Sequence, residues 1–499
     1  MQLISTSFFL LVLVTFVIYT VFPKRQRWIV LLVSSLTFYL CAGMFSFIII
    51  LTFTLSSYLF ALLMKRCDRQ EGEFVALSHE KENKKRKRKK SYYVHVFSVL
   101  LLLSLWVVIR RVSPSVAIGI SFYSLRVVSY LYDVQKGRVE MHQNLFKYTL
   151  FVTFFPLSYL GPVAIYRDIS DQLYSGRRAR AEEITSGLFR ITKGIFKKLV
   201  IANSLSLPLA LIASSPERYS GVYVLFLLVF YTAEIYCDFS GGIDISLGVG
   251  SLFGINLPEN FARPFASVNL REFWNRWHIT LGEWFEAYVF YPVSLSTAMQ
   301  KLSKKCRRRF GTRYGKRLPL YVSTMLTWLL TGLWHGGQGH FIAWGLINGA
   351  MVLVSQELSR PLSRFLDKHP RLKNSEARLL FGRVRVFLII GAVRLLDVYK
   401  SLPLTARMLS SIFFDVESYK SFFGGGIFEL FKLSGFIVVL IALLFVFLLG
   451  FIDGERKNKP QKAYVSVTLM IFMTLSTLVF GTYGIGYDAS DFIYSHFNG

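Results

Sequence analysis

The chain has 499 residues, of which 53% are hydrophobic, 16% aromatic and only 18% charged. Soluble globular domains usually carry about 25% charged residues, so this composition, with a mean hydropathy of +0.44, excludes a disordered protein and argues against a soluble multidomain enzyme. A net charge of +28 would suggest nucleic-acid binding in a soluble protein. In an apolar chain it indicates cytoplasmic segments, which gather Lys and Arg. We therefore predict an integral membrane protein with no nucleic-acid partner.

Uncharged stretches predict the membrane-spanning helices, each of which needs about 20 mostly apolar residues. Met1–Pro23 lacks a basic n-region and a small-residue cleavage site, so we expect a span there and not a cleaved signal peptide. Residues 28–64, hinged near Gly43, and residues 318–356 are each long enough for two spans. Further stretches lie at 91–109, 148–166, 199–216, 219–233, 433–452 and 463–487, and charges interrupt weaker candidates at 112–134 and 384–400. We expect an all-α polytopic membrane protein, one domain over residues 1–499, with ten to twelve transmembrane helices.

Basic segments predict the orientation of these helices. Lys and Arg follow the first span, fill residues 65–90 and recur at Lys301–Arg317. If all three segments are cytoplasmic loops of a plasma-membrane protein, the N-terminus is extracytoplasmic. The all-basic run Lys84–Lys90 resembles a nucleic-acid patch, but spans flank it on both sides. We interpret it as a topology anchor in contact with anionic membrane lipid.

One segment, residues 256–292, does not resemble a spanning helix. It combines ten aromatic residues with charges of both signs, which a single spanning helix does not tolerate without partners. Asn269, followed by Glu272, is an N-cap signal for a helix that begins at Leu270. On such a helix Trp274 and His278 would share one face. An interfacial or re-entrant segment fits this pattern, and the alternative is an amphipathic surface helix with an incidental histidine.

A second histidine, His335, lies within residues 318–356, where the chain carries no Lys, Arg, Asp or Glu. An ionisable group at membrane depth is costly and therefore indicates function. Glycines on both sides of it, among them Gly332 and Gly336, allow backbone or a ligand to approach closely. The alternative is a core histidine that is hydrogen-bonded to a backbone carbonyl. The four cysteines form no CxxC pair, so we expect neither a disulfide framework nor a metal site.

Together these segments resemble the membrane-bound O-acyltransferase (MBOAT) family, in its branch of alginate O-acetylases and teichoic acid D-alanyl transferases. The motifs that carry the resemblance are Phe273-Trp-Asn-Arg-Trp-His278, Gly332-Leu-Trp-His-Gly336, Asp238-Phe-Ser-Gly-Gly-Ile-Asp244 and Leu257-Pro-Glu-Asn-Phe261. Weaker matches extend over roughly residues 1–490. The resemblance implies interfacial and re-entrant helices around a central tunnel, and an enzyme that transfers an acyl group to a hydroxyl.

Carried over from the family, the essential membrane-embedded histidine is His335, and His278 is its partner. Substrate-binding or supporting roles are expected for the other motif residues, Trp274, Asn275, Arg276, Trp277, Trp334, Asp238, Asp244 and Asn260. The resemblance also implies a cytoplasmic thioester donor, acetyl-CoA or an acyl carrier protein, with no tightly bound cofactor. The acceptor would be a cell-surface glycan on the other face, and a separate extracytoplasmic transferase would be a partner.

The chemistry of these residues agrees with that expectation. Acyl transfer to an alcohol needs a base that removes the hydroxyl proton, a step to which a positioned histidine contributes about 10²–10⁴-fold. The oxyanion that forms must be stabilised. Candidate donors are Asn275, Arg276, Trp277 and backbone N–H groups near Gly336.

Three departures from the family pattern leave donor and acceptor open: Glu286-Ala287 replaces a basic–acidic pair, Gly242-Ile243 replaces Tyr-Ser, and Asn348 replaces a histidine. Within the enzyme hypothesis we expect polysaccharide acetylation, with D-alanylation of teichoic acid as the alternative. Alternatives from other classes are a transporter or flippase for a lipid-linked glycan, and a catalytically inactive scaffold.

Overall fold

The computed structural model describes residues 3–76, 81–112, 119–373, 375–430, 433–455 and 463–483. The described chain is almost entirely helical, and its only β-type pairing is an isolated antiparallel bridge between Phe261 and Trp277. It divides into two compact units, the first formed mainly by residues 1–191 and 242–258 and the second by residues 192–241 and 259–497. The expected all-α class is confirmed.

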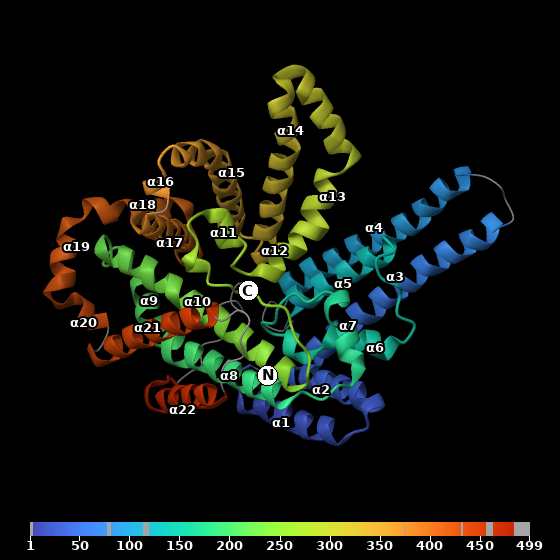
Figure 1. The fold of residues 1–499 in the computed structure, drawn as a ribbon, viewed down its shortest axis with the longest axis horizontal. Helices are drawn as coiled ribbons and strands as arrows, with labels where there is room; N and C mark the ends of the chain where they lie inside the picture. Colours follow the sequence, from blue (N-terminus) through green and yellow to red (C-terminus); the bar gives the residue numbers. More distant parts are fainter. Residues whose placement is uncertain are drawn as a thin grey trace. The chain divides into compact units, whose positions relative to one another are not determined.

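The first unit is built from helices, most of which contain an apolar stretch of the sequence; Figure 1 shows their order along the chain. They are α1 (Thr6–Val21), α2 (Arg27–Ala42), α3 (Met44–Ala76), α4 (Lys81–Val112), α5 (Ile120–Gln135), α6 (Leu145–Thr153), α7 (Tyr166–Ser175) and most of α8 (Ala181–Phe196). The predicted hinge is present, because Gly43 has φ 132° and separates α2 from α3. A residue with a side chain rarely adopts this conformation, and glycine adopts it without strain.

The basic residues 65–90, which we expected as a loop between two spans, are helical wherever the structure describes them. Helix α3 continues to Ala76, and α4 already begins at Lys81, so the segment extends two long helices. The run Lys84–Lys90 belongs to α4, and all of its side chains except that of Lys90 lie outside the described part. Lys, Arg and Glu are good helix formers, which explains why a charged connection between two spans continues their helices.

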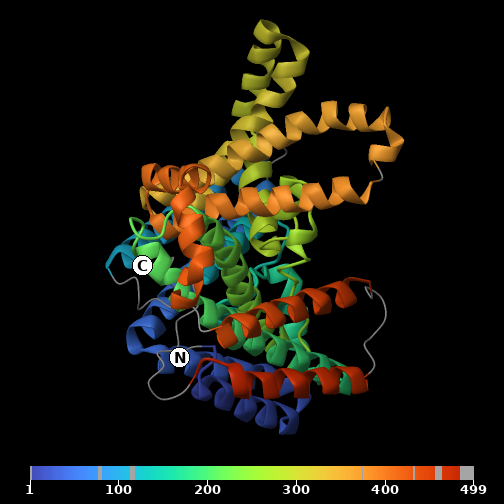
Figure 2. The same ribbon diagram turned by 90° about the vertical axis from the view of Figure 1, so that its left-hand side faces the viewer.

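The second unit contains the remaining helices and the π-helical turns η3 (Lys197–Ala202), η5 (Glu286–Phe290) and η6 (Phe422–Gly426). Its helices are α9 (Asn203–Ser214), most of α10 (Val222–Leu252), α11 (Leu270–Trp274), α12 (Ile279–Phe285), α13 (Tyr291–Ser294), α14 (Thr297–His335), α15 (Gly339–Asp367), α16 (Pro370–Lys373), α17 (Glu376–Tyr399), α18 (Leu402–Phe414), α19 (Val416–Ser421), α20 (Ile427–Leu430), α21 (Leu433–Glu455) and α22 (Ala463–Phe480). Helices α15 and α17 lie side by side, joined through α16 (Figure 2).

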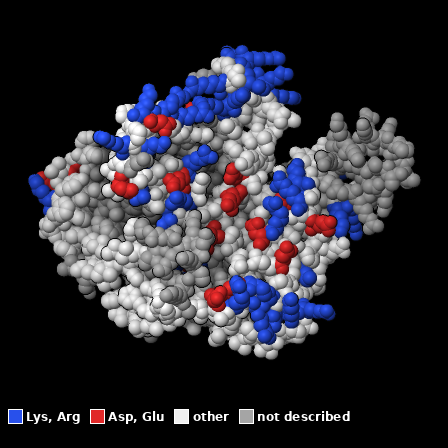
Figure 3. Space-filling model, viewed as in Figure 1, with Lys and Arg blue, Asp and Glu red and all other residues white. Residues whose placement is uncertain are grey.

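The predicted basic loop Lys301–Arg317 is a helical hairpin within α14. Gly311 breaks the helix with φ 81° and ψ 168°, and the hydroxyl of Ser303 on one arm donates to the carbonyl of Gly315 on the other at 2.8 Å. Figure 3 shows blue side chains gathered over this hairpin. The cations that line a hollow on its first arm follow a helical spacing: Lys301, Lys304, Lys305, Arg308 and Arg309.

Five helices of the described part are long and apolar enough to cross a membrane: Met44–Cys67, Lys90–Ile109, Ala181–Ser214, Val222–Leu252 and Gly339–Asp367. A bent pair, Val416–Leu430 with Gly435–Leu448, would make a sixth, and four shorter apolar helices accompany them. The chain is therefore a multi-pass membrane protein. The number of ten to twelve crossings stays a prediction, as does the central tunnel.

Candidate active site

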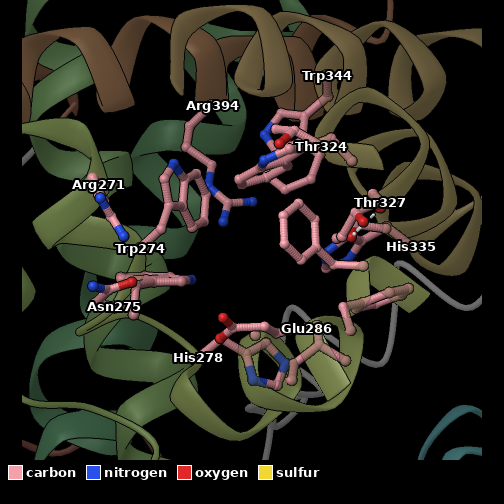
Figure 4. Close-up of a pocket in the computed structure, with 17 residues that line it drawn as sticks. Arg271, Trp274, Asn275, His278, Glu286, Thr324, Thr327, His335, Trp344 and Arg394 are labelled. Atoms are coloured by element: carbon pink, nitrogen blue, oxygen red, sulfur yellow. Dashed lines mark hydrogen bonds between the residues drawn. The ribbon is translucent and has the colours of Figure 1, made fainter. Parts of the chain in front are cut away.

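A cavity of about 250 Å³ in the second unit brings both predicted histidines together (Figure 4). His278 and His335 lie on its wall although 56 residues separate them in the chain. The elements that contribute to the wall are the α11–α12 segment, η5, the second arm of α14, α15 and α17. Other residues that line the cavity are Arg271, Trp274, Asn275, Trp277, Glu286, Thr324, Thr327, Trp328, Thr331, Trp344 and Arg394.

His278 is held by Asn260, which fixes its tautomer. The Oδ1 atom of Asn260 lies 3.2 Å from Nδ1 of His278 and also accepts from the backbone N–H and the hydroxyl of Thr280, at 3.1 and 2.9 Å. A backbone N–H can only donate, so the Asn260 atom that faces it is the oxygen. An amide oxygen can only accept, so Nδ1 of His278 carries the proton. Nε2 is therefore the basic nitrogen of this ring.

The conformation of His278 differs from the expected helix. The N-cap prediction is confirmed, because α11 begins at Leu270 and Asn269 accepts from the backbone N–H of Glu272 at 2.9 Å. However, α11 ends at Trp274, and His278 adopts the left-handed conformation (φ 50°, ψ 50°) that precedes α12. The i,i+4 argument for a shared helical face is therefore wrong. The backbone N–H of Ile279 donates to the carbonyl of Asn260 at 3.0 Å, which ties this turn in place.

The surroundings of His278 keep its ring neutral. The side chain is 4% exposed, and the ring of Phe239 packs edge-on against it at 4.8 Å. Burial lowers the pKa of His278 to about 3, and the positive charge of Arg394 contributes in the same direction. The imidazole is therefore a hydrogen-bonding group across the physiological pH range and a weak base.

His335 is the last residue of α14 and is buried, with 6% exposed. Gly336 takes an extended conformation and ends the helix, and the chain turns into α15. Gly332 allows the two helices to meet, because a Cβ atom there would lie 2.5 Å from the carbonyl oxygen of Phe341. The rings of Trp344 and Phe341 lie 5.1 and 6.4 Å from that of His335. The glycines were expected to let backbone or a ligand approach closely, and at Gly332 it is the backbone of α15 that does so.

A tryptophan cluster and a buried ion pair complete the cavity, and both were missed in the sequence. Trp274 lies 4.8 Å from Trp328 and 5.9 Å from Trp344, measured between ring centroids. Arg394, 4% exposed, covers the ring of Trp344 at 5.1 Å and donates from Nη1 to Asp397 at 3.0 Å. Opposite charges three residues apart in the apolar stretch 384–400 were the signal that could have identified this pair.

Most motif residues of the α11–α12 segment line the cavity, but Arg276 does not. Trp274, Asn275 and Trp277 are part of its wall. The side chain of Arg276 donates from Nη2 to the carboxylate of Glu272, four residues earlier, at 2.6 Å.

Trp334 contacts both histidines, with its ring centroid 6.1 Å from that of His278 and 4.9 Å from that of His335. The N–H of Gly336 donates to the carbonyl of Gly332 at 3.0 Å.

The remaining predicted residues are not among those that line this cavity. Asp238 forms a buried ion pair with Lys198 at 2.6 Å in the second unit, whereas Asp244 pairs with Arg190 at 3.4 Å in the first. Asn348 is buried and donates to the carbonyl of Trp344, four residues earlier in its own helix. Among the departures noted in the sequence, Glu286 is the one that lines the cavity. No cluster of three or more His, Cys, Asp or Glu side chains in the described ranges could hold a metal ion.

The fold and the site define a polytopic α-helical membrane protein with a two-histidine cavity. Residues 74–391 match the family model of the membrane-bound O-acyltransferases, and the chain belongs to this family. It is 35% identical over 243 residues to the "probable alginate O-acetylase" of Azotobacter vinelandii, a match that covers 48% of this chain and 44% of that relative.

Two further relatives carry other names. The peptidoglycan O-acetyltransferase of Helicobacter pylori is 28% identical over 281 residues, which cover 51% of this chain and 50% of the relative. The teichoic acid D-alanyltransferase of Streptococcus thermophilus is 26% identical over 292 residues, 56% of this chain and 67% of the relative. The chain thus spans about half the length of most of these relatives.

Proposed function

We propose that this protein is an O-acyltransferase that moves an acyl group from a thioester to a hydroxyl in the cavity lined by His278 and His335. The observation that carries the proposal is that both histidines, themselves buried, line one cavity and that one of them is held in a single tautomer by Asn260. A transporter needs a polar path and not a fixed ring. An inactive scaffold needs neither.

In the proposed reaction His335 is the general base. It takes the proton of the acceptor hydroxyl as the hydroxyl oxygen attacks the thioester carbonyl, and a tetrahedral oxyanion forms. When the carbonyl re-forms, the C–S bond breaks, and the thiolate leaves and receives the proton. His278, neutral and weakly basic, orients the hydroxyl or the ring of His335 from the acceptor side, where Nε2 can accept a hydrogen bond.

Arg394 is placed to stabilise the oxyanion. Its guanidinium lines the cavity, and its charge acts on His278 electrostatically. Preorganised positive charge in a water-poor site is worth far more than in water. The guanidinium donates from Nη1 to Asp397 at 3.0 Å, which holds it in place, so that little reorganisation accompanies the reaction.

For the substrates we propose an acetyl thioester, of coenzyme A or a carrier protein, bound from the cytoplasm, and an exported cell-surface glycan as acceptor. The relatives' names, which refer to alginate, peptidoglycan and teichoic acid, support an acceptor in the cell envelope. D-alanyl transfer is the second candidate, supported by the match to a D-alanyltransferase. We place the protein in the plasma membrane with its N-terminus outside and an extracytoplasmic transferase as its partner.

The test is transfer by the purified protein in nanodiscs. Radiolabelled acetyl-CoA, acetyl carrier protein and D-alanyl carrier protein are each combined with alginate oligosaccharides, peptidoglycan fragments or teichoic acid. Label in the acceptor, lost in His335→Ala, supports the proposal. Movement of unmodified glycan across proteoliposomes without any label transfer would instead identify a transporter.

A further inference from the structure

Two consecutive lysines, Lys197 and Lys198, are buried in the second unit and take no part in the proposed reaction. They are 5% and 3% exposed and belong to the π-helical turn η3, inside the candidate span Ala181–Ser214. Lys198 interacts with two buried carboxylates, Asp238 and Glu234, which lie one helical turn apart on α10, itself a candidate span. An ionisable group at membrane depth is costly and therefore indicates function.

The two lysines hold α10 through directed contacts. Nζ of Lys198 lies 2.6 Å from Oδ1 of Asp238. Nζ of Lys197 donates to the hydroxyl of Ser240 at 3.0 Å and lies 5.5 Å from the ring centroid of Tyr236. One π-helical turn thus contacts three side chains within five residues of α10.

The backbones of α10 and of the chain around η3 also meet closely. A Cβ atom at Gly241 would lie 2.9 Å from the carbonyl oxygen of Gly194 and 3.4 Å from the Cβ atom of Lys197. Glycine allows two backbones to approach in this way. The ion pair and this contact together fix the register of residues 236–241 against η3.

The same stretch of α10 carries two rings that pack against residues of the cavity wall. The ring of Phe239 packs edge-on against His278, with the centroids 4.8 Å apart. The ring centroid of Tyr236 lies 6.1 Å from that of Trp277. His278 and Trp277 line the cavity, whereas residues 236–240 are not among its lining residues. The lysines are therefore connected to the cavity wall through these two rings.

We propose that Lys198, through its ion pair with Asp238, is a positioning residue that holds Phe239 against His278 and so keeps the His278 ring aligned for acyl transfer. This inference rests on the proposed function of the cavity. A buried ion pair often adds no net stability over apolar side chains of similar volume. The salt bridge is directional, however, and apolar side chains at these two positions would not select one register in the same way.

The first experiment is a double-mutant cycle on the transfer rate. Lys198→Met should lower kcat by about 10- to 100-fold, the range that misorientation causes, with little change in the KM for the thioester. In a His278→Ala background the same substitution should cause no further loss, because Lys198 acts through that ring. Losses that multiply would overturn the proposal. Lys420→Met is the matched control, because it breaks an exposed ion pair with Glu417 in the same unit, and it should leave kcat unchanged.

The second experiment needs no acyl transfer, so it separates a failure of this inference from a failure of the proposed function. Diethyl pyrocarbonate modifies neutral imidazoles that it can reach, and mass spectrometry reads each histidine separately. His278 should be protected in the wild type and in Lys198→Arg, which keeps the ion pair, and should react several-fold faster in Lys198→Met. Continued protection of His278 in a folded Lys198→Met variant would overturn the proposal. An equal rise at His335 would do the same, because it would show a general loosening of the cavity.

Lys198→Met leaves Asp238 buried without its counter-charge and so risks failure to fold. In that case Phe239→Leu keeps the proposal testable, because it removes the ring that packs against His278 and leaves the ion pair in place. We expect the same rise in His278 reactivity, and a loss of kcat that disappears in the His278→Ala background. Wild-type reactivity and kcat in a folded Phe239→Leu variant would show that this ring does not hold His278, and the proposal would be wrong.

Discussion

At the residue scale, the two histidines of the cavity are held by different means. Asn260 is the hydrogen-bond partner that selects the tautomer of His278, and the end of a helix and packed rings, Trp344 among them, help to position His335. The fixed, neutral ring of His278 suits the orientation of a substrate hydroxyl. The ring of His335, at a helix end beside the cavity, suits proton transfer. The two substitutions that follow separate these roles.

We predict that His335→Ala abolishes acyl transfer, a loss of at least the 10²–10⁴-fold that general base catalysis supplies, while the protein remains folded in membranes. Steady-state transfer and detergent size-exclusion chromatography provide the measurement. His340→Ala is the matched control, because this histidine lies in the first turn of α15, five residues after His335, and does not line the cavity. Near-normal turnover by a well-expressed His335→Ala variant would remove this histidine from the mechanism.

His278→Ala should lower the transfer rate by about 10²-fold, the loss that misorientation causes, without the total loss expected for His335→Ala. Donor binding on the cytoplasmic side should be largely unchanged, as measured by equilibrium binding of the thioester. Loss of donor binding, with normal acceptor dependence of any residual turnover, would place His278 in the thioester pocket instead.

Asn260→Asp tests the tautomer through pH. In the wild type the pKa of His278 is about 3, so its titration lies below the working range of a rate assay. A carboxylate beside Nδ1 stabilises the imidazolium and raises that pKa. The variant should therefore lose activity as the pH falls through the raised pKa and recover it at higher pH. The pH dependence of kcat is the measurement. A profile identical to that of the wild type would show that residue 260 does not control the protonation of the His278 ring.

At the element scale, the close approach of α14 and α15 positions His335. A Cβ atom at Gly332 would lie 2.5 Å from the carbonyl oxygen of Phe341, and one at Gly345 on α15 would lie 2.4 Å from the carbonyl oxygen of Trp328. The interface is thus made by small residues, as in many membrane helix pairs. Any side chain at these positions must push the helices apart.

Gly332→Val should therefore destabilise the protein by about 1–3 kcal/mol, the usual cost of overpacking, and lower acyl transfer because His335 moves. The unfolding midpoint in detergent and the transfer rate are measured together. Gly339→Ala is the control, since nothing lies within 4 Å of a Cβ at that position, and it should behave like the wild type. If Gly332→Val and Gly339→Ala had equal effects on stability and transfer, the close contact of α14 with α15 would not be what positions His335.

At the scale of the whole molecule, the strongest prediction from charge is the orientation in the membrane. The basic run Lys84–Lys90 and the hairpin residues Arg307–Arg309 should face the cytoplasm. In a background without the four native cysteines, single cysteines at these positions should not react with an impermeant thiol reagent on intact cells. Ser7→Cys, near the N-terminus and exposed, should react. Labelling of the basic segments from outside would invert the topology and the side of the donor.

Composition determined the membrane class and the helical fold, because these depend on the length of apolar runs and the positions of Lys and Arg. Residue spacing within single segments picked out the two histidines that line the cavity. The N-cap at Asn269 and the hinge at Gly43 are local in the same sense, and both are confirmed.

Tertiary structure alone decided which residues share a cavity. Asn260 reaches His278 only because a left-handed turn interrupts the expected helix, and Arg394 reaches the same space from a helix more than 100 residues further along the chain. Asp238 and Asp244, six residues apart in one motif, bind different partners in different units. Spacing along a chain fixes neighbours over a turn or two of helix, whereas contacts between distant segments follow from packing, which no single stretch of sequence contains.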